Sequence, residues 1–163
     1  MKFSGHDTFA CRTTWLYKGI DLLNKKRRSD NQIDITILNG NQSTIELGVG
    51  KNMVNAIKHW LLAFGIVEME ENDFGVLAEL IYADGDDDNN LDAFIEDKFT
   101  LWILHHEICT RKYASIFNYF FKEYFKRKST RTFSESEFVG SLASYIKGEG
   151  ESLPSLNSLS TDF

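Results

Sequence analysis

The apolar residues between positions 43 and 68 repeat at helical spacing and predict two helices joined by a tight turn. Gly48 and Gly50 bracket the turn. A second, longer helix is expected from about Lys51 to Phe64, with Gly65 at the position of a C-terminal cap. One face of this helix carries the apolar side chains Met53, Val54, Ile57, Trp60, Leu61 and Phe64. The pattern is typical of a helix-turn-helix.

The opposite face of this second helix carries polar side chains and no acid. Lysine matches the acceptors of guanine, asparagine matches the edge of adenine, and the N-terminal residues of a recognition helix lie nearest the bases. The pattern therefore predicts contact with duplex DNA through Lys51, Asn52, Asn55, Lys58 and His59. A polar face that only meets solvent is the alternative interpretation.

An earlier helix is predicted over Thr13–Asn24, where apolar residues again recur at helical spacing. It is followed by four consecutive cations, Lys25, Lys26, Arg27 and Arg28. Cations at this position complement the C-terminal end of a helix dipole. Beside a DNA-reading unit they could equally hold phosphates, and the sequence leaves both interpretations open.

The remaining segments of the N-terminal region favour a winged-helix order. Alternating isoleucines predict a short strand over Ile33–Ile37, and Ser43 with Glu46 has the spacing of a capping box. Ile66–Glu70 is expected to form one strand of a hairpin, and Phe74–Tyr82 either the return strand or a helix. We therefore predict a winged-helix-like domain over residues 1–83.

The C-terminal half reads as helical. Helices are expected from Asp97, over Tyr113–Phe125, and after a capping box at Ser134 and Glu137 that leads into a helix ending at Gly148. These would form a helical domain over 84–148 that packs on the first, followed by a flexible tail over 149–163. The predicted fold class is thus mainly α, a winged-helix-like helix-turn-helix unit with a small β-hairpin followed by an α-helical bundle.

The charge is unevenly distributed. The 163 residues carry a net charge of −6, but positions 68 to 97 hold twelve acids and no Lys or Arg, so the segments on either side are mildly basic. This acidic block, Glu68 to Asp97, offers a second functional hypothesis: a protein-protein interaction scaffold that binds a basic partner and no nucleic acid. No apolar run is long enough to span a bilayer and no signal peptide is evident, so we expect a cytoplasmic protein without membrane contact.

Residues with catalytic or metal-binding chemistry form no convincing set. The acidic run Asp84–Asp92 lacks the glycine and the final glutamate of a hand-type calcium loop. His6, Cys11, His105 and His106 could meet only through the fold, since no spacing typical of a zinc helix or an activated nucleophile links them. We predict no metal, no cofactor and no enzymatic activity.

Three separated segments, Phe3–Arg12, Glu46–Val67 and Leu91–Ile108, resemble the family known as domain of unknown function 4007. The resemblance implies a setting in bacterial defence and DNA sulfur-modification islands. Members of that family are generally much longer than this chain. The expected function is therefore a non-enzymatic DNA-binding or adaptor component of a prokaryotic defence or DNA-modification system, with duplex DNA and protein components of that system as partners.

Overall fold

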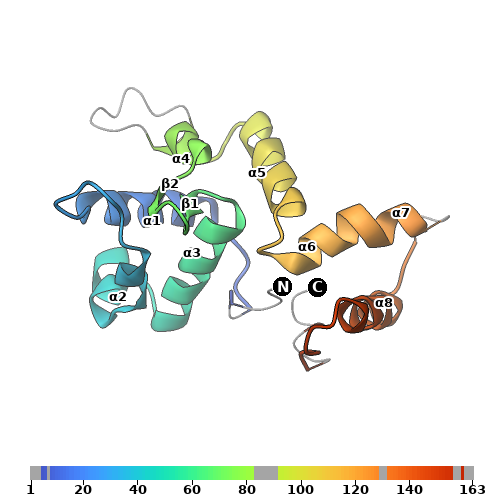
Figure 1. Ribbon diagram of the computed structural model, residues 1–163. Helices are drawn as coiled ribbons and strands as arrows, with labels where there is room; N and C mark the ends of the chain where they lie inside the picture. The colour runs from blue at the N-terminus through green and yellow to red at the C-terminus, as the bar shows by residue number, and fades with distance from the viewer. Residues whose placement is uncertain (1–4, 7, 83–91, 129–131, 156–158, 160–163) are drawn as a thin grey trace. The chain divides into compact units, whose positions relative to one another are not determined.

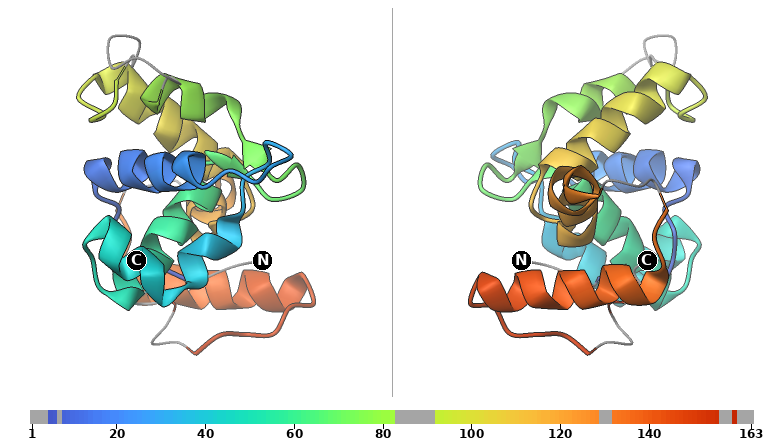
Figure 2. Two further views of the ribbon diagram at one scale, coloured as in Figure 1. Left: turned by 90° about the vertical axis from the view of Figure 1, so that its left-hand side faces the viewer. Right: turned by 90° about the vertical axis from the view of Figure 1, so that its right-hand side faces the viewer.

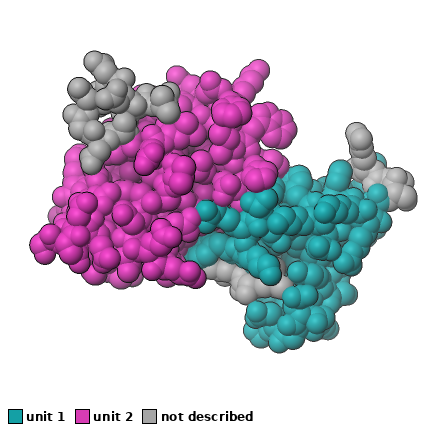
Figure 3. Space-filling model, turned by 45° about the horizontal axis from the view of Figure 1, so that its top comes forward, with its two compact units in different colours: residues 1–4, 108–163 teal, residues 5–107 magenta. Residues whose placement is uncertain are grey.

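The computed structural model describes residues 5–6, 8–82, 92–128, 132–155 and 159, and these residues are mainly helical with one two-stranded hairpin (Figure 1). The predicted fold class is confirmed in these terms. The chain divides into two compact units, one of residues 5–107 and the other containing residues 108–163 (Figure 3). The predicted boundary between residues 83 and 84 and most of the run Asp84–Asp92 lie outside the described residues.

The first unit is built from α1 (Thr13–Lys25), the 3-10 helix η1 (Ile35–Asn39), α2 (Asn41–Leu47), α3 (Lys51–Ala63), the strands β1 (Val67–Glu68) and β2 (Asp73–Phe74), and α4 (Val76–Ile81). Helix α5 (Lys98–Thr110) begins in this unit and runs past its last residue. No helix among the described residues is both long and apolar enough to cross a membrane.

Helices α1, α2 and α3 lie side by side, and α1 contacts both of the others (Figures 1 and 2). Leu16, Ile20 and Leu23 of α1 are almost completely buried, as are Ile57 and Leu61 of α3. These side chains repeat at three- and four-residue intervals, so each helix directs one apolar stripe into a shared core. This core fixes α3, the predicted recognition helix.

The hairpin pairs Val67 with Phe74 and Glu68 with Asp73 in antiparallel register. The segment Phe74–Tyr82 was predicted to be either the return strand or a helix, and it contains part of each. Strand β2 ends at Phe74, and α4 begins two residues later. The hairpin thus returns the chain to α1, against which α4 packs.

Two local predictions in this unit are wrong. The segment predicted as a strand forms η1, because the Asp34 carboxylate accepts a hydrogen bond from the Thr36 amide at 3.0 Å and caps a helical turn. Ser43 does not cap α2, whose N-cap is Gly40. Ser43 is instead buried within the helix and donates to the Ile37 carbonyl at 2.5 Å.

The second unit contains α6 (Ser115–Tyr119), a π-helical segment η3 (Phe120–Tyr124), α7 (Phe125–Arg127) and α8 (Glu135–Gly148). The first three occupy the predicted helix over Tyr113–Phe125, with a change of helical geometry in its middle. The Ser134 side chain accepts from the Glu137 amide, so Ser134 is confirmed as the cap of α8. The core joins Ile116, Tyr119, Tyr124, Phe138, Leu142, Ile146 and Leu159.

Candidate nucleic-acid interface

The turn between α2 and α3 has the predicted glycine geometry. Gly48 ends α2 in the left-handed conformation (φ 65°), which an L side chain rarely adopts, and its amide donates to the Ile45 carbonyl at 3.3 Å. Gly50 is the N-cap of α3, and its carbonyl accepts from the Val54 amide at 3.0 Å. The chain therefore forms two adjacent helices joined by a tight turn, as the sequence predicts.

The first turn of α3 projects into solvent. Lys51 and Asn52 are exposed, whereas Asn55 and Lys58 are partly buried. The Lys58 ammonium donates to the Asn39 side-chain oxygen at 2.9 Å, which ties the middle of α3 to the end of η1. Of the predicted base-reading residues, Lys51 and Asn52 are thus the most accessible to a ligand.

His59 does not lie on the exposed face, and that prediction is wrong. Only 4% of its surface is accessible, and its ring lies edge-on to the rings of His6 and Trp60 with centroids 5.3 Å and 5.1 Å away. The Trp60 indole N–H donates to the Phe9 carbonyl at 3.0 Å. The segment that contains His6 and Phe9, here called the N-terminal arm, therefore packs against this part of α3 and covers the face on which a helical wheel places His59.

The four consecutive cations at the C-terminal end of α1, Lys25 to Arg28, each contact a carboxylate. The N···O distances are 2.8 Å for Lys25–Asp21, 2.6 Å for Lys26–Glu46, 3.2 Å for Arg27–Asp73 and 2.7 Å for Arg28–Asp34. Lys26 lowers the pKa of Glu46 by a direct hydrogen bond. A phosphate bound by this segment would therefore have to replace or share these carboxylates.

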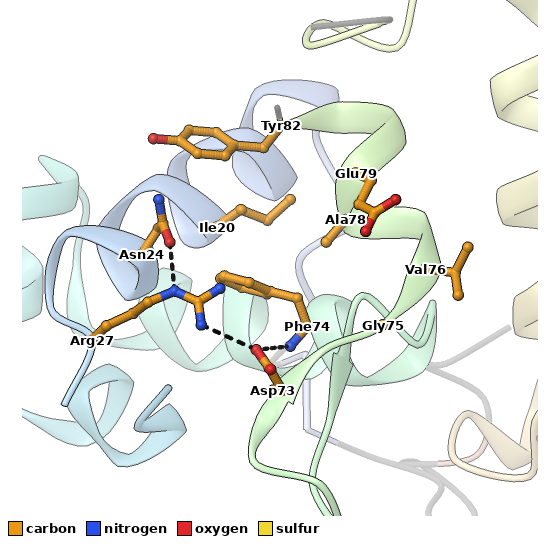
Figure 4. A pocket seen from close by; sticks show the side chains of 10 residues that line it. All are labelled: Ile20, Asn24, Arg27, Asp73, Phe74, Gly75, Val76, Ala78, Glu79 and Tyr82. Carbon is orange, nitrogen blue, oxygen red and sulfur yellow. Dashed lines mark hydrogen bonds and ion pairs between the residues drawn. The ribbon is translucent and has the colours of Figure 1, made fainter. Parts of the chain in front are cut away.

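Arg27 also lines a pocket of about 520 Å³ between α1 and α4 (Figure 4). Its guanidinium lies over the Phe74 ring, 5.1 Å from the centroid, and donates from Nε to the Asn24 side-chain oxygen at 2.7 Å. Arg27 is therefore held by packing and hydrogen bonds, unlike a mobile surface cation. The remaining lining residues are Ile20, Asp73, Gly75, Val76, Ala78, Glu79 and Tyr82.

The histidines and cysteines considered as catalytic or metal-binding residues do not form a metal site among the described residues. Within the part of the chain that the structure describes, no group of three or more His, Cys, Asp or Glu residues could hold a metal ion. His6 lies beside His59, and His105 stacks edge-on with Trp102 on α5, with ring centroids 5.9 Å apart. Burial raises the pKa of the Cys11 thiol to about 12, so this sulfur is protonated at neutral pH and a poor nucleophile.

Sequence reasoning missed the exposure of aromatic side chains on α5. The sequence predicts a helix from Asp97 but not which of its side chains are exposed, and Phe99 and Trp102 are both about two-thirds exposed. The signal that could have found them is that α5 is apolar on all its sides, which leaves more apolar surface than one contact face can bury.

Two crystal structures of SspB share this fold. The magnesium-bound structure gives a TM-score of 0.73 at 22% identity, covering 96% of this chain and 45% of SspB. The second gives a TM-score of 0.70 at 22% identity, covering 96% and 46%. The chain thus spans less than half the length of SspB, and at this identity the likeness shows the fold alone.

No curated protein matches the sequence. The family model described as "Protein of unknown function (DUF4007)" matches residues 3–163 and confirms the resemblance. The chain therefore belongs to this family.

Proposed function

We propose that this chain is a non-enzymatic DNA-binding or adaptor component of a prokaryotic defence or DNA-modification system, and that it contacts duplex DNA with the first turns of α3. The observation that carries the proposal is the exposure of Lys51 and Asn52 at the start of a helix that contains no acid and follows a tight inter-helix turn. Helices that read a major groove present their N-terminal residues in this way.

The setting comes from similarity. SspB, whose fold this chain shares, is a component of a DNA phosphorothioation system, and we extend that setting to the present chain as part of the proposal. Duplex DNA is present in any system that modifies DNA, so a DNA-contacting helix fits such a component.

In the proposed mode of binding, Lys51 and Asn52 reach base edges or nearby phosphates. Asn55 and Lys58, which are partly buried on the same side of α3, border the contact. His59 has no part in it because its ring is buried. Lys26 and Arg28 would contribute phosphate contacts only by exchanging Glu46 and Asp34 for phosphate oxygens.

The experiment that tests this function is fluorescence anisotropy of the protein with a labelled random duplex at several salt concentrations. We expect log affinity to fall linearly with log salt, with a slope of about −0.9 for each phosphate neutralised. Once a preferred site is found by selection from random duplexes, Asn52→Ala is expected to relax the sequence preference of the protein. The absence of binding at the lowest salt concentration contradicts the proposal.

A further inference from the structure

Helix α5 presents apolar side chains on opposite sides. Leu104 and Ile108 are buried, one turn apart, on its inner side. On its outer side Phe99 and Trp102, three residues apart and therefore neighbours on the helix surface, are each 69% exposed. A helix that is apolar all round is normally buried all round, so this outer side has the composition of a covered surface.

Phe94, four residues before the start of α5, is a further exposed aromatic side chain. It is 60% exposed, and its ring lies 6.2 Å from that of Tyr17 on α1. We call the side chains of Phe94, Phe99 and Trp102 the aromatic surface. Exposed apolar side chains that neighbour one another, as Phe99 and Trp102 do on α5, mark interaction sites in soluble proteins, whereas scattered single ones do not.

The backbone that carries the aromatic surface is held in place by its own acids. The Asp97 carboxylate accepts from the Phe99 amide at 2.7 Å at the start of α5. The Asp92 carboxylate accepts from the amides of Glu96 and Asp97 at 2.8 Å and 3.1 Å. The rings therefore project from an ordered segment, and little backbone freedom remains to be lost when a partner binds.

The residues next to the aromatic surface in the sequence are mainly acidic, which favours a basic partner. Glu96 is exposed, and Lys98 is the only cation in the sequence between positions 68 and 107. Aromatic side chains that stack nucleic-acid bases stand in basic grooves, so an acidic setting disfavours a nucleic acid. Lysine and arginine side chains of a partner would complement it.

We propose that the aromatic surface binds a basic amphipathic helix of a partner protein. The apolar side chains of that helix cover Phe94, Phe99 and Trp102, and its Lys or Arg residues pair with Glu96 and neighbouring acids. This proposal does not depend on the binding of duplex DNA by α3, and its failure is distinguishable because its test contains no duplex DNA.

The fluorescence of Trp102 can report the binding of a partner to the aromatic surface. The sequence has three tryptophans, of which Trp15 and Trp60 are 3% and 5% exposed, so quenching of fluorescence by acrylamide reports Trp102. The probe is a synthetic helical peptide of Leu and Lys at amphipathic spacing, without tryptophan, and its matched control carries Glu at every Lys. We expect the basic peptide to protect Trp102 and to shift its emission to the blue, with the acidic peptide at least about tenfold weaker.

Variants locate the contact. Phe99→Ala and Glu96→Lys are each expected to weaken binding of the basic peptide by about tenfold, the effect of removing a central interface side chain. Met69→Ala is the matched control, because Met69 is 56% exposed and also flanked by acids but lies in the hairpin turn. It should bind the peptide like the unmodified protein.

Several results overturn the proposal. Equal protection of Trp102 by the acidic and basic peptides removes the charge argument, and no protection by either removes the docking surface. Protection that increases with protein concentration alone, with dimers seen by analytical ultracentrifugation, assigns the surface to a second copy. Protection by single-stranded oligonucleotides assigns it to nucleic acid instead.

Discussion

Gly75 lies where the hairpin meets α4, at a position with no room for a side chain. A Cβ there would stand 2.2 Å from the Gly65 carbonyl oxygen, although the backbone angle of −76° is one that any residue adopts. We therefore expect Gly75→Ala to lower the free energy of unfolding by about 1–3 kcal/mol, measured by urea denaturation. Gly140→Ala is the control, since a Cβ on α8 meets open space there. It should leave stability unchanged or raise it by up to about 1 kcal/mol, and equal effects of the two variants would contradict this account.

The Asp34 carboxyl has a lowered pKa. The Thr36 hydroxyl, the Arg28 guanidinium and the Thr36 amide all donate to it and lower its pKa from 3.8 to about 2. Because the folded pKa lies below the unfolded one, this carboxylate stabilises the fold above pH 4. The contribution is lost as the pH falls from about 4 toward 2.

Thr36→Val removes the hydroxyl, which is the largest cause of this shift, and keeps the size of the side chain. We expect the pKa of Asp34 to rise toward 3.8, measured by carbon NMR of the carboxyl group during an acid titration. Thr44→Val is the control, because the Thr44 hydroxyl donates to the Asn41 carbonyl instead. An Asp34 pKa that stays near 2 in Thr36→Val contradicts the assigned cause.

Single residues also show where sequence reasoning reaches its limit. Lys51 and Asn52 are exposed as expected, because the start of a surface helix faces solvent on most of its circumference. His59 was misplaced because a helical wheel assumes one buried side. From His59 to Ala63, α3 is buried all round, by the α1 core and by the N-terminal arm. Contacts from the arm, which is about fifty residues away along the chain, leave no periodic signal.

At the scale of elements, the ion pair between Lys26 and Glu46 joins the end of α1 to α2. Glu46→Gln tests whether Lys26, one of the four cations, can act as a phosphate ligand. This variant removes the charge that pairs with Lys26 and keeps the shape of the side chain. We expect duplex DNA to bind more tightly, with the salt slope steeper by about 1. Fluorescence anisotropy at several salt concentrations measures both quantities.

Glu135→Gln is the matched control for Glu46→Gln. Glu135 is exposed in the first turn of α8, so its substitution removes the same charge at a distant place in the sequence. If the two variants change DNA affinity equally, the gain in affinity reflects net charge alone, and Lys26 has no specific part in binding.

Elements with strong periodicity were predictable nearly to the residue. Helix α1 ends one residue beyond the predicted Asn24, and α3 one residue before the predicted Phe64. The strand predicted over Ile33–Ile37 was wrong, although its apolar residues alternate as in a strand. The hydrogen bonds between Asp34 and Thr36 favour a helical turn instead. In so short a segment, two side-chain hydrogen bonds outweigh the pattern.

At the scale of the whole molecule, the net charge of −6 does not indicate which cations can bind DNA, because that depends on where each charge lies in the fold. The sequence allows the basic segment Lys25–Arg28 to be either a complement to the helix dipole or a phosphate site, and its carboxylate partners lie up to 46 residues away along the chain. Only the fold brings Asp73 and Glu46 to these cations. Lysines without a nearby acid in the fold therefore carry more weight for DNA binding than lysines that are merely clustered in the sequence.

The central claim is that duplex DNA contacts the first turn of α3. The most direct measurement compares Lys51→Ala with Lys147→Ala, which removes the same charge from an exposed position on α8. The salt dependence of duplex affinity is measured by fluorescence anisotropy for each protein. The account predicts that Lys51→Ala weakens binding and lowers the salt slope by about 1, while Lys147→Ala matches the unmodified protein. Equal affinities and slopes for the two variants would contradict it.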